Sequence, residues 1–76
     1  MPLYYFNIHC EEFETTDLVG ESCDTFEQVR SGAIRAARDL VLQDLLSGRV
    51  PHQGWIEVED EDHRAVLSLP LSAAAS

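Results

Sequence analysis

One long stretch of the chain repeats hydrophobic residues at helical spacing and has clear signals at both ends. Asp24 can accept hydrogen bonds from the N–H groups of a first helical turn, and Glu27 can reach back as in a capping box. Gly48 is a typical C-terminal stop, and Pro51 prevents the helix from resuming. We therefore predict a single helix that begins at Thr25. Its buried face should contain Phe26, Val29, Ala33, Ala36, Ala37, Leu40 and Val41, with Ile34 and Leu45 at the edge.

The segment before this helix predicts one strand followed by a loop. Residues 3–8 alternate so that Tyr4, Phe6 and Ile8 fall on one side, which we expect to face the core. Residues 9–23 are rich in acidic residues and Thr, which favours a loop with at most a short extra strand, and Gly20 marks a turn.

The segment after the helix predicts a β-hairpin of residues 55–59 and 65–71, separated by Asp60-Glu61-Asp62-His63. Pro70 makes the last strand an edge strand or ends it there. The predicted fold class is α+β, with one helix packed on an antiparallel sheet of three strands, or four, in the order β-α-β-β. Because 76 residues have room for one core, we expect a single domain over residues 1–71 and a frayed tail over residues 72–76.

Four positions depart from a simple amphipathic helix. Leu42 and Leu46 lie four residues apart on the polar side and predict an exposed apolar pair, a candidate partner surface. Asp44 falls near the middle of the buried face, so either the last turn departs from ideal geometry or Asp44 pairs with an arginine, for which Arg49 is nearest. Gly32 costs about 1 kcal/mol relative to Ala in a helix, which indicates a close contact there.

Trp55 has the opposite strand parity to Ile56 and Val58 and should lie on the back of the sheet. Two interpretations remain open for it. Trp55 either covers the back of the sheet together with Tyr5 or acts as an anchor at a protein interface, where Trp is enriched. The candidate interface residues are therefore Leu42, Leu46, Tyr5 and Trp55.

The residues that could bind a metal or take part in catalysis predict neither a metal site nor an active site. The cluster of His9, Cys10 and Cys23 has no C-x-x-C or H-x-x-x-H spacing, and a structural zinc site needs four ligands. No nucleotide-binding or hydrolase motif occurs, and a helix on one sheet seldom encloses an active-site pocket. We expect a non-enzymatic protein with no cofactor, no bound metal and reduced cysteines.

The formal net charge of -9 excludes some classes of partner. Fourteen acidic residues face five arginines, whereas phosphate binding needs clustered basic residues, so nucleic acid is not an expected partner. No apolar run is long enough to span a bilayer, and the N-terminus lacks the basic start of a secretory signal. We expect no membrane association and a cytoplasmic location.

Several short motifs follow one another in an order that resembles that of one known family. These motifs are Met1-x-x-Tyr4-Tyr5-Phe6, Asp17-x-x-Gly20, the helix Ala33-Ile34-Arg35-Ala36-Ala37-Arg38-Asp39-Leu40, and Ile56-Glu57-Val58-x-Asp60-Glu61 before Leu67-x-Leu69-Pro70. Nearly the whole chain resembles the domain of unknown function 6894 family. The resemblance implies a bacterial protein with no assigned activity and supplies no catalytic residues. His63 stands where the hairpin turn of such proteins usually has Gly.

Two functional hypotheses follow. The first is a small non-enzymatic protein-interaction or regulatory module, because the sequence offers surfaces and no pocket chemistry. The alternative is a metal- or thiol-dependent sensor that uses Cys10, Cys23 and His9. Partners of the module can be another protein or a second copy of the chain in a homodimer.

Overall fold

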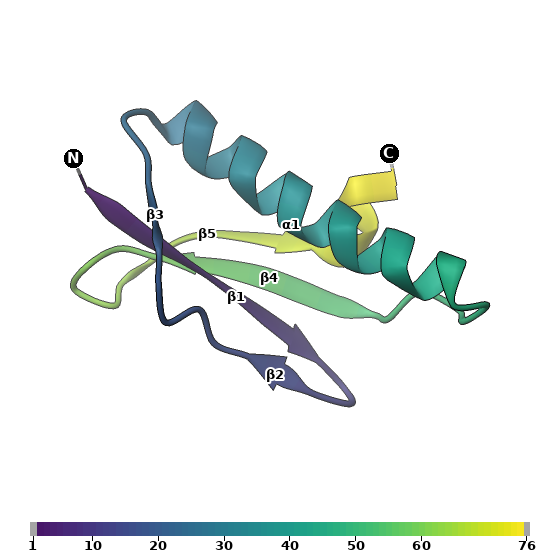
Figure 1. Cartoon of the computed structure of the whole chain (residues 1–76). Helices are drawn as coiled ribbons and strands as arrows, with labels where there is room; N and C mark the ends of the chain where they lie inside the picture. Colours follow the sequence, from purple (N-terminus) through teal and green to yellow (C-terminus); the bar gives the residue numbers. More distant parts are fainter. Residues whose placement is uncertain (1, 76) are drawn as a thin grey trace.

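The computed structural model describes residues 2–75 and contains one long helix above a sheet (Figure 1). Its elements in chain order are β1 (Leu3–Cys10), β2 (Glu14–Thr15), β3 (Glu21–Ser22), α1 (Phe26–Leu46), β4 (Gly54–Glu59), β5 (Ala65–Pro70) and the short 3-10 helix η1 (Leu71–Ala75). The α+β fold class is confirmed. Within residues 2–75, no helix combines the length and apolar character that crossing a membrane requires.

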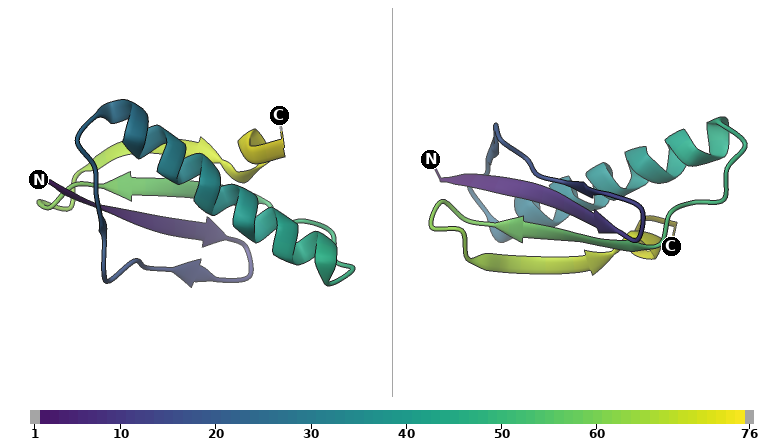
Figure 2. Two further views of the ribbon diagram at one scale, coloured as in Figure 1. Left: turned by 45° about the horizontal axis from the view of Figure 1, so that its top comes forward. Right: turned by 90° about the horizontal axis from the view of Figure 1, so that it is seen from below.

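All strands of the sheet pair in antiparallel fashion, in the order β2-β1-β4-β5, with β3 also paired to β1. The segment before the helix thus contributes two short strands, both paired with β1, whereas we predicted at most one. β5 is an edge strand that ends at Pro70, as predicted. The helix crosses one face of the sheet diagonally (Figure 2), and within the described residues the opposite face has no helix on it.

The core lies between α1 and the sheet, where alternate residues of β1 and β4 meet small residues of the helix. Ile56, Val58, Val29 and Ala33 are at most 1% exposed, and the β1 residues Tyr4, Phe6 and Ile8 pack against them as predicted. A Cβ atom on Gly32 would lie 3.0 Å from Cζ of Phe6. The predicted close contact at Gly32 is therefore confirmed.

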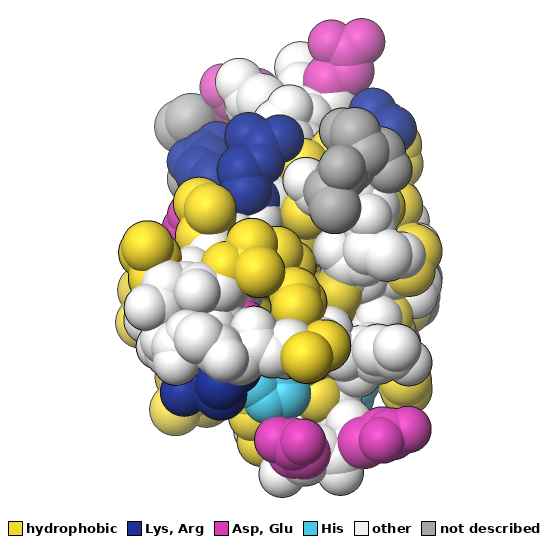
Figure 3. Space-filling model, turned by 90° about the vertical axis from the view of Figure 1, so that its right-hand side faces the viewer, with side chains coloured by type: hydrophobic (Ala, Val, Ile, Leu, Met, Phe, Trp, Pro, Cys, Tyr) yellow, Lys and Arg dark blue, Asp and Glu magenta, His cyan; other side chains and the backbone are white. Residues whose placement is uncertain are grey.

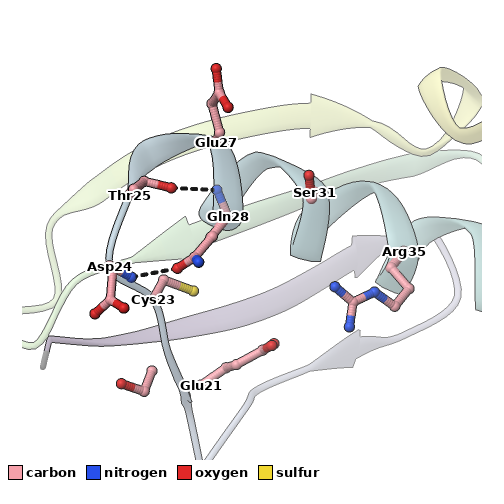
Figure 4. A pocket seen from close by; sticks show the side chains of 9 residues that line it. Glu21, Cys23, Asp24, Thr25, Glu27, Gln28, Ser31 and Arg35 are labelled. Carbon is pink, nitrogen blue, oxygen red and sulfur yellow. Dashed lines mark hydrogen bonds between the residues drawn. The ribbon is translucent and has the colours of Figure 1, made fainter.

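The start of α1 lies one residue later than predicted. Thr25, not Asp24, is the N-cap, and its hydroxyl accepts the backbone N–H of Gln28 at 3.2 Å. The side chain of Gln28 accepts the N–H of Asp24 at 2.6 Å, whereas Glu27 points away from the cap (Figure 4). The predicted Asp24–Glu27 capping box is wrong because Thr25 takes the role of N-cap and Gln28, rather than Glu27, accepts the N–H of Asp24.

The end of the chain is ordered further than predicted. Leu71 is 1% exposed and belongs to the core, and Ala74 packs against that core from η1. Because Pro70 ends β5, the following residues turn back over the sheet edge toward α1 (Figure 1). Residues 71–75 thus form a helical turn where we expected fraying from residue 72, and Ser76 lies outside the described residues.

The Asp17 side chain links the segment between β2 and β3 to strand β1 by hydrogen bonds. Its carboxylate accepts the backbone N–H groups of Phe6, Val19 and Gly20 at 3.0–3.2 Å. Desolvation opposes the effect, but these three N–H groups lower the pKa of Asp17 below its usual value. Gly20 has a φ of +80°, which confirms the predicted turn and explains the Asp17-x-x-Gly20 motif.

Candidate functional site

Three leucines form an exposed apolar surface on the last turns of α1, which we name the helix-end patch. Leu42, Leu45 and Leu46 are 48%, 56% and 87% exposed, and their spacing places them on one side of the helix. The predicted exposure of Leu42 and Leu46 is confirmed, whereas Leu45 was expected at the edge of the buried face. Figure 3 shows hydrophobic side chains gathered at this end of the molecule, bordered by arginine, histidine and acidic side chains.

The length of α1 explains why these leucines escape burial. At the other end of α1, Phe26 is 58% exposed, so its predicted place on the buried face is wrong. Twenty-one helical residues extend about 31 Å, whereas the six residues of β4 or of β5 extend about 20 Å. The last turns therefore continue past the sheet (Figure 1). Between them and the β1–β2 segment lies a hollow of about 760 Å³, whose lining includes Leu42, Leu46 and Phe13.

Asp44 is the buried residue that holds this overhanging end in place. Its side chain is 0% exposed, and Oδ1 accepts from both Nε and Nη2 of Arg49 at 3.3 Å. Its backbone carbonyl accepts the N–H groups of Ser47 and Arg49. The predicted pairing of Asp44 with Arg49 is therefore confirmed, and the chain reversal after the helix wraps around one carboxylate.

His52 supplies a second set of contacts to Asp44 that the sequence did not reveal. Oδ2 of Asp44 accepts the backbone N–H of His52 at 2.9 Å and lies 2.6 Å from Nδ1 of its ring. Nε2 of the same ring lies 3.1 Å from Oε2 of Glu12 in the β1–β2 turn. An ionised carboxylate only accepts, so the two ring nitrogens can donate to both carboxylates at once only in the protonated imidazole.

These contacts shift the pKa values of Asp44 and His52 so that the charged form of each side chain is favoured. The backbone N–H of His52 is the main cause that lowers the pKa of Asp44, and the His52 ring and Arg49 lower it further. The hydrogen bond that the His52 ring donates to Asp44 is the main cause that raises the pKa of His52 above its usual 6.5; desolvation opposes this, and the hydrogen bond to Glu12 raises the pKa further. The network thus joins α1, the loop after it and the β1–β2 turn through the His52 ring, with the protonated form of the ring favoured.

The opposite surface is the open face of the sheet, which carries Tyr5 and Trp55. Trp55 is 46% exposed and stacks on His9 at 5.0 Å between ring centroids, with 15° between the ring planes. Tyr5 lies two rows away, because β1 and β4 pair His9 with Trp55 and Tyr5 with Glu59. The two predicted interface aromatics share a face without touching, and the His9–Trp55 stack is a feature that strand parity alone could not find.

The structure does not bring together the residues of the sensor hypothesis. The N–H of Cys23 donates to the carbonyl of Pro2, next to the start of β1, whereas Cys10 is the last residue of this eight-residue strand, about 26 Å along it. Both thiols are free, and burial is the main cause that raises the pKa of each. In the part of the chain that the structure describes, no three His, Cys, Asp or Glu side chains gather as a metal-binding group.

Comparisons with known proteins identify the family of the chain. No curated protein and no solved structure matches the sequence. The sequence model of the family described as "Domain of unknown function (DUF6894)" matches residues 3–72, which include every strand and all of α1. The chain therefore belongs to the DUF6894 family.

Proposed function

We propose that the chain is a small non-enzymatic protein-interaction module that binds its partner through the helix-end patch. The observation that carries the proposal is the exposure of Leu42, Leu45 and Leu46 together on one side of a helix end. Isolated surface leucines are common in proteins, but a contiguous apolar set on a helix is typical of helix-in-groove recognition.

The rigid support of the patch favours binding over simple exposure. Asp44, one position before Leu45, is buried and bonded to Arg49 and His52, so the last turn of α1 is fixed from inside. A surface that is already ordered loses little conformational entropy when a partner binds it. The buried network therefore supports a role for the patch as a preformed surface.

The setting that we propose is the bacterial cytoplasm. The family resemblance supports a bacterial source, and the free thiols of Cys10 and Cys23 are consistent with a reducing compartment. The partner is a second protein, or a second copy of this chain in a homodimer.

Photo-crosslinking in the native host tests the proposal. A photoreactive amino acid at position 46 should give one discrete adduct, and the same residue at exposed position 30, near the other end of α1, should not. An adduct of twice the chain mass identifies a homodimer, and any other mass identifies a different protein. The absence of an adduct at position 46, or the same adducts at both positions, would overturn the proposal.

A further inference from the structure

The open face of the sheet combines aromatic rings with carboxylates. In the strand register, His9 lies opposite Trp55, and the next rows place Glu57 opposite Asn7 and Glu59 opposite Tyr5. On the outer strand, Glu14 lies opposite His9, which extends the first row to Glu14–His9–Trp55. Rings and acidic groups therefore alternate across one surface that no helix covers within the described residues.

Trp55 presents an accessible ring beside a carboxylate. One face of the indole is stacked on His9, and the residue remains 46% exposed, so the stack leaves part of Trp55 accessible. Oε1 of Glu57, the next residue but one on the same strand and face, lies 3.9 Å from Nε2 of His9. Trp55, His9 and Glu57 thus form one contiguous group.

None of the strands that the structure describes contains an arginine or a lysine. Helix α1 carries three arginines and three acidic residues, so the whole net charge of -9 belongs to the sheet and the loops. Among the described residues, the salt bridges of Glu14 and Glu57 involve His9 only. Glu59 instead accepts a hydrogen bond from Asn7 at 2.8 Å.

We propose that the open face binds an arginine-bearing segment of a protein partner, with the guanidinium placed against the Trp55 ring and hydrogen-bonded to Glu57. Arginine fits better than lysine because its planar group stacks on an aromatic ring while its fork of N–H donors matches a carboxylate. The acidic surroundings attract such a segment and repel nucleic acid. This surface is distinct from the helix-end patch, so either surface can fail its test while the other passes.

Trp55 fluorescence tests the proposal directly, because Trp55 is the only Trp in the chain. Titration with a blocked peptide of four Gly-Arg repeats should change the emission saturably, with half-saturation at about 0.1–1 mM and weaker binding as salt rises. The same peptide with citrulline, the neutral isostere of arginine, should leave the emission unchanged. Absence of a saturable change with the arginine peptide, or equal changes with both peptides, would overturn the proposal.

A matched pair of variants separates the proposed site from general charge attraction. Glu57→Gln should weaken the arginine peptide roughly tenfold, because a charge-assisted hydrogen bond is lost. Glu27→Gln removes the same charge from the exposed start of α1 and should weaken binding less than twofold by net charge alone. Equal weakening in the two variants, with unchanged far-UV circular dichroism, would show that binding is nonspecific.

Discussion

The two ends of α1 are held by different kinds of contact. At the start, exposed Thr25 and Gln28 make two hydrogen bonds with neighbouring backbone and side-chain groups. At the end, the buried carboxylate of Asp44 contacts the Arg49 side chain, the backbone N–H of His52 and the His52 ring. The exposed cap is local, whereas the buried network joins three segments of the chain.

This difference shows which end of the helix depends on the rest of the fold for its stability. An exposed cap exchanges its hydrogen bonds with water, so its loss is mild. A buried carboxylate has no water to replace a lost partner, so removing one member leaves the others unpaired in the interior. The end that carries the helix-end patch should therefore be the more sensitive one to mutation and to pH.

Asp44→Asn should have the largest effect on stability. The neutral amide leaves Arg49 and the protonated His52 ring without their shared carboxylate, and we expect Tm to fall by on the order of 10 °C or more. Thermal unfolding followed by circular dichroism measures the change. Asp39→Asn, which removes the same charge from an exposed position of α1, should shift Tm by only a few degrees, and equal shifts would contradict the buried network.

The pH dependence of stability should be the next largest effect. Because the folded-state pKa of His52 is raised, its contribution is fully present below the usual value of 6.5 and is lost as pH rises through the higher folded value. Because the pKa of Asp44 is lowered, its contribution is present above the usual value of 3.8 and is lost as pH falls through the lower folded value.

Urea unfolding at a series of pH values tests this window. Between pH 6 and 9 the free energy of unfolding should fall more steeply for the parent than for His52→Asn, which has no ring to titrate there. The ring also faces Glu12 and Phe13, and Arg49 reaches it through Asp44. Burial, and then the charges of Asp44 and Glu12, raise the pKa of the nearby Cys10 thiol above its usual 9.0, so this thiol titrates above the range. Parallel curves for parent and variant would show that His52 is not protonated in the folded state.

Thr25→Ala should have the smallest of the three effects. Loss of the exposed N-cap hydrogen bond should lower the free energy of unfolding by about 1 kcal/mol, or Tm by about 4–8 °C, with no dependence on pH between 6 and 9. Thr16→Ala, in the exposed loop, serves as control and should be nearly neutral. An effect of Thr25→Ala as large as that of Asp44→Asn would remove the distinction between the two ends.

The elements of the fold could be predicted because their periodicity is local. The alternation in β1 and β4 and the helical repeat of α1 are visible in single segments, and so are the glycines that permit close contact or a left-handed turn. His63, where the family resemblance implied Gly, adopts a φ of 63°, in the region that favours Gly. The cap was misplaced by one residue because Asp24 and Thr25 are both good N-cap residues.

The features that could not be predicted from the sequence depend on contacts between distant segments of the chain. The pairing of β2 and β3 with β1 involves two residues each, too short for any alternation to show. Arg49 was found as a partner of Asp44 because it is close in sequence, whereas His52 lies beyond a chain reversal at Gly48 and Glu12 lies forty residues away from His52. The His9–Trp55 stack required the strand register, which no single strand reveals.

The chain reversal around Asp44 has a consequence for motion at the end of α1. Helix ends normally fray, and their amide protons then exchange rapidly with solvent. Here the amide groups of Ser47, Gly48 and Arg49 donate to carbonyls of residues 43–45, and that of His52 donates to the buried carboxylate. Exchange of the His52 proton requires its hydrogen bond to the Asp44 carboxylate to break, and exchange of the other three requires the chain reversal to open. Their protection against deuterium should therefore be high for a helix terminus and should report the closed state of the surface that Leu45 and Leu46 present.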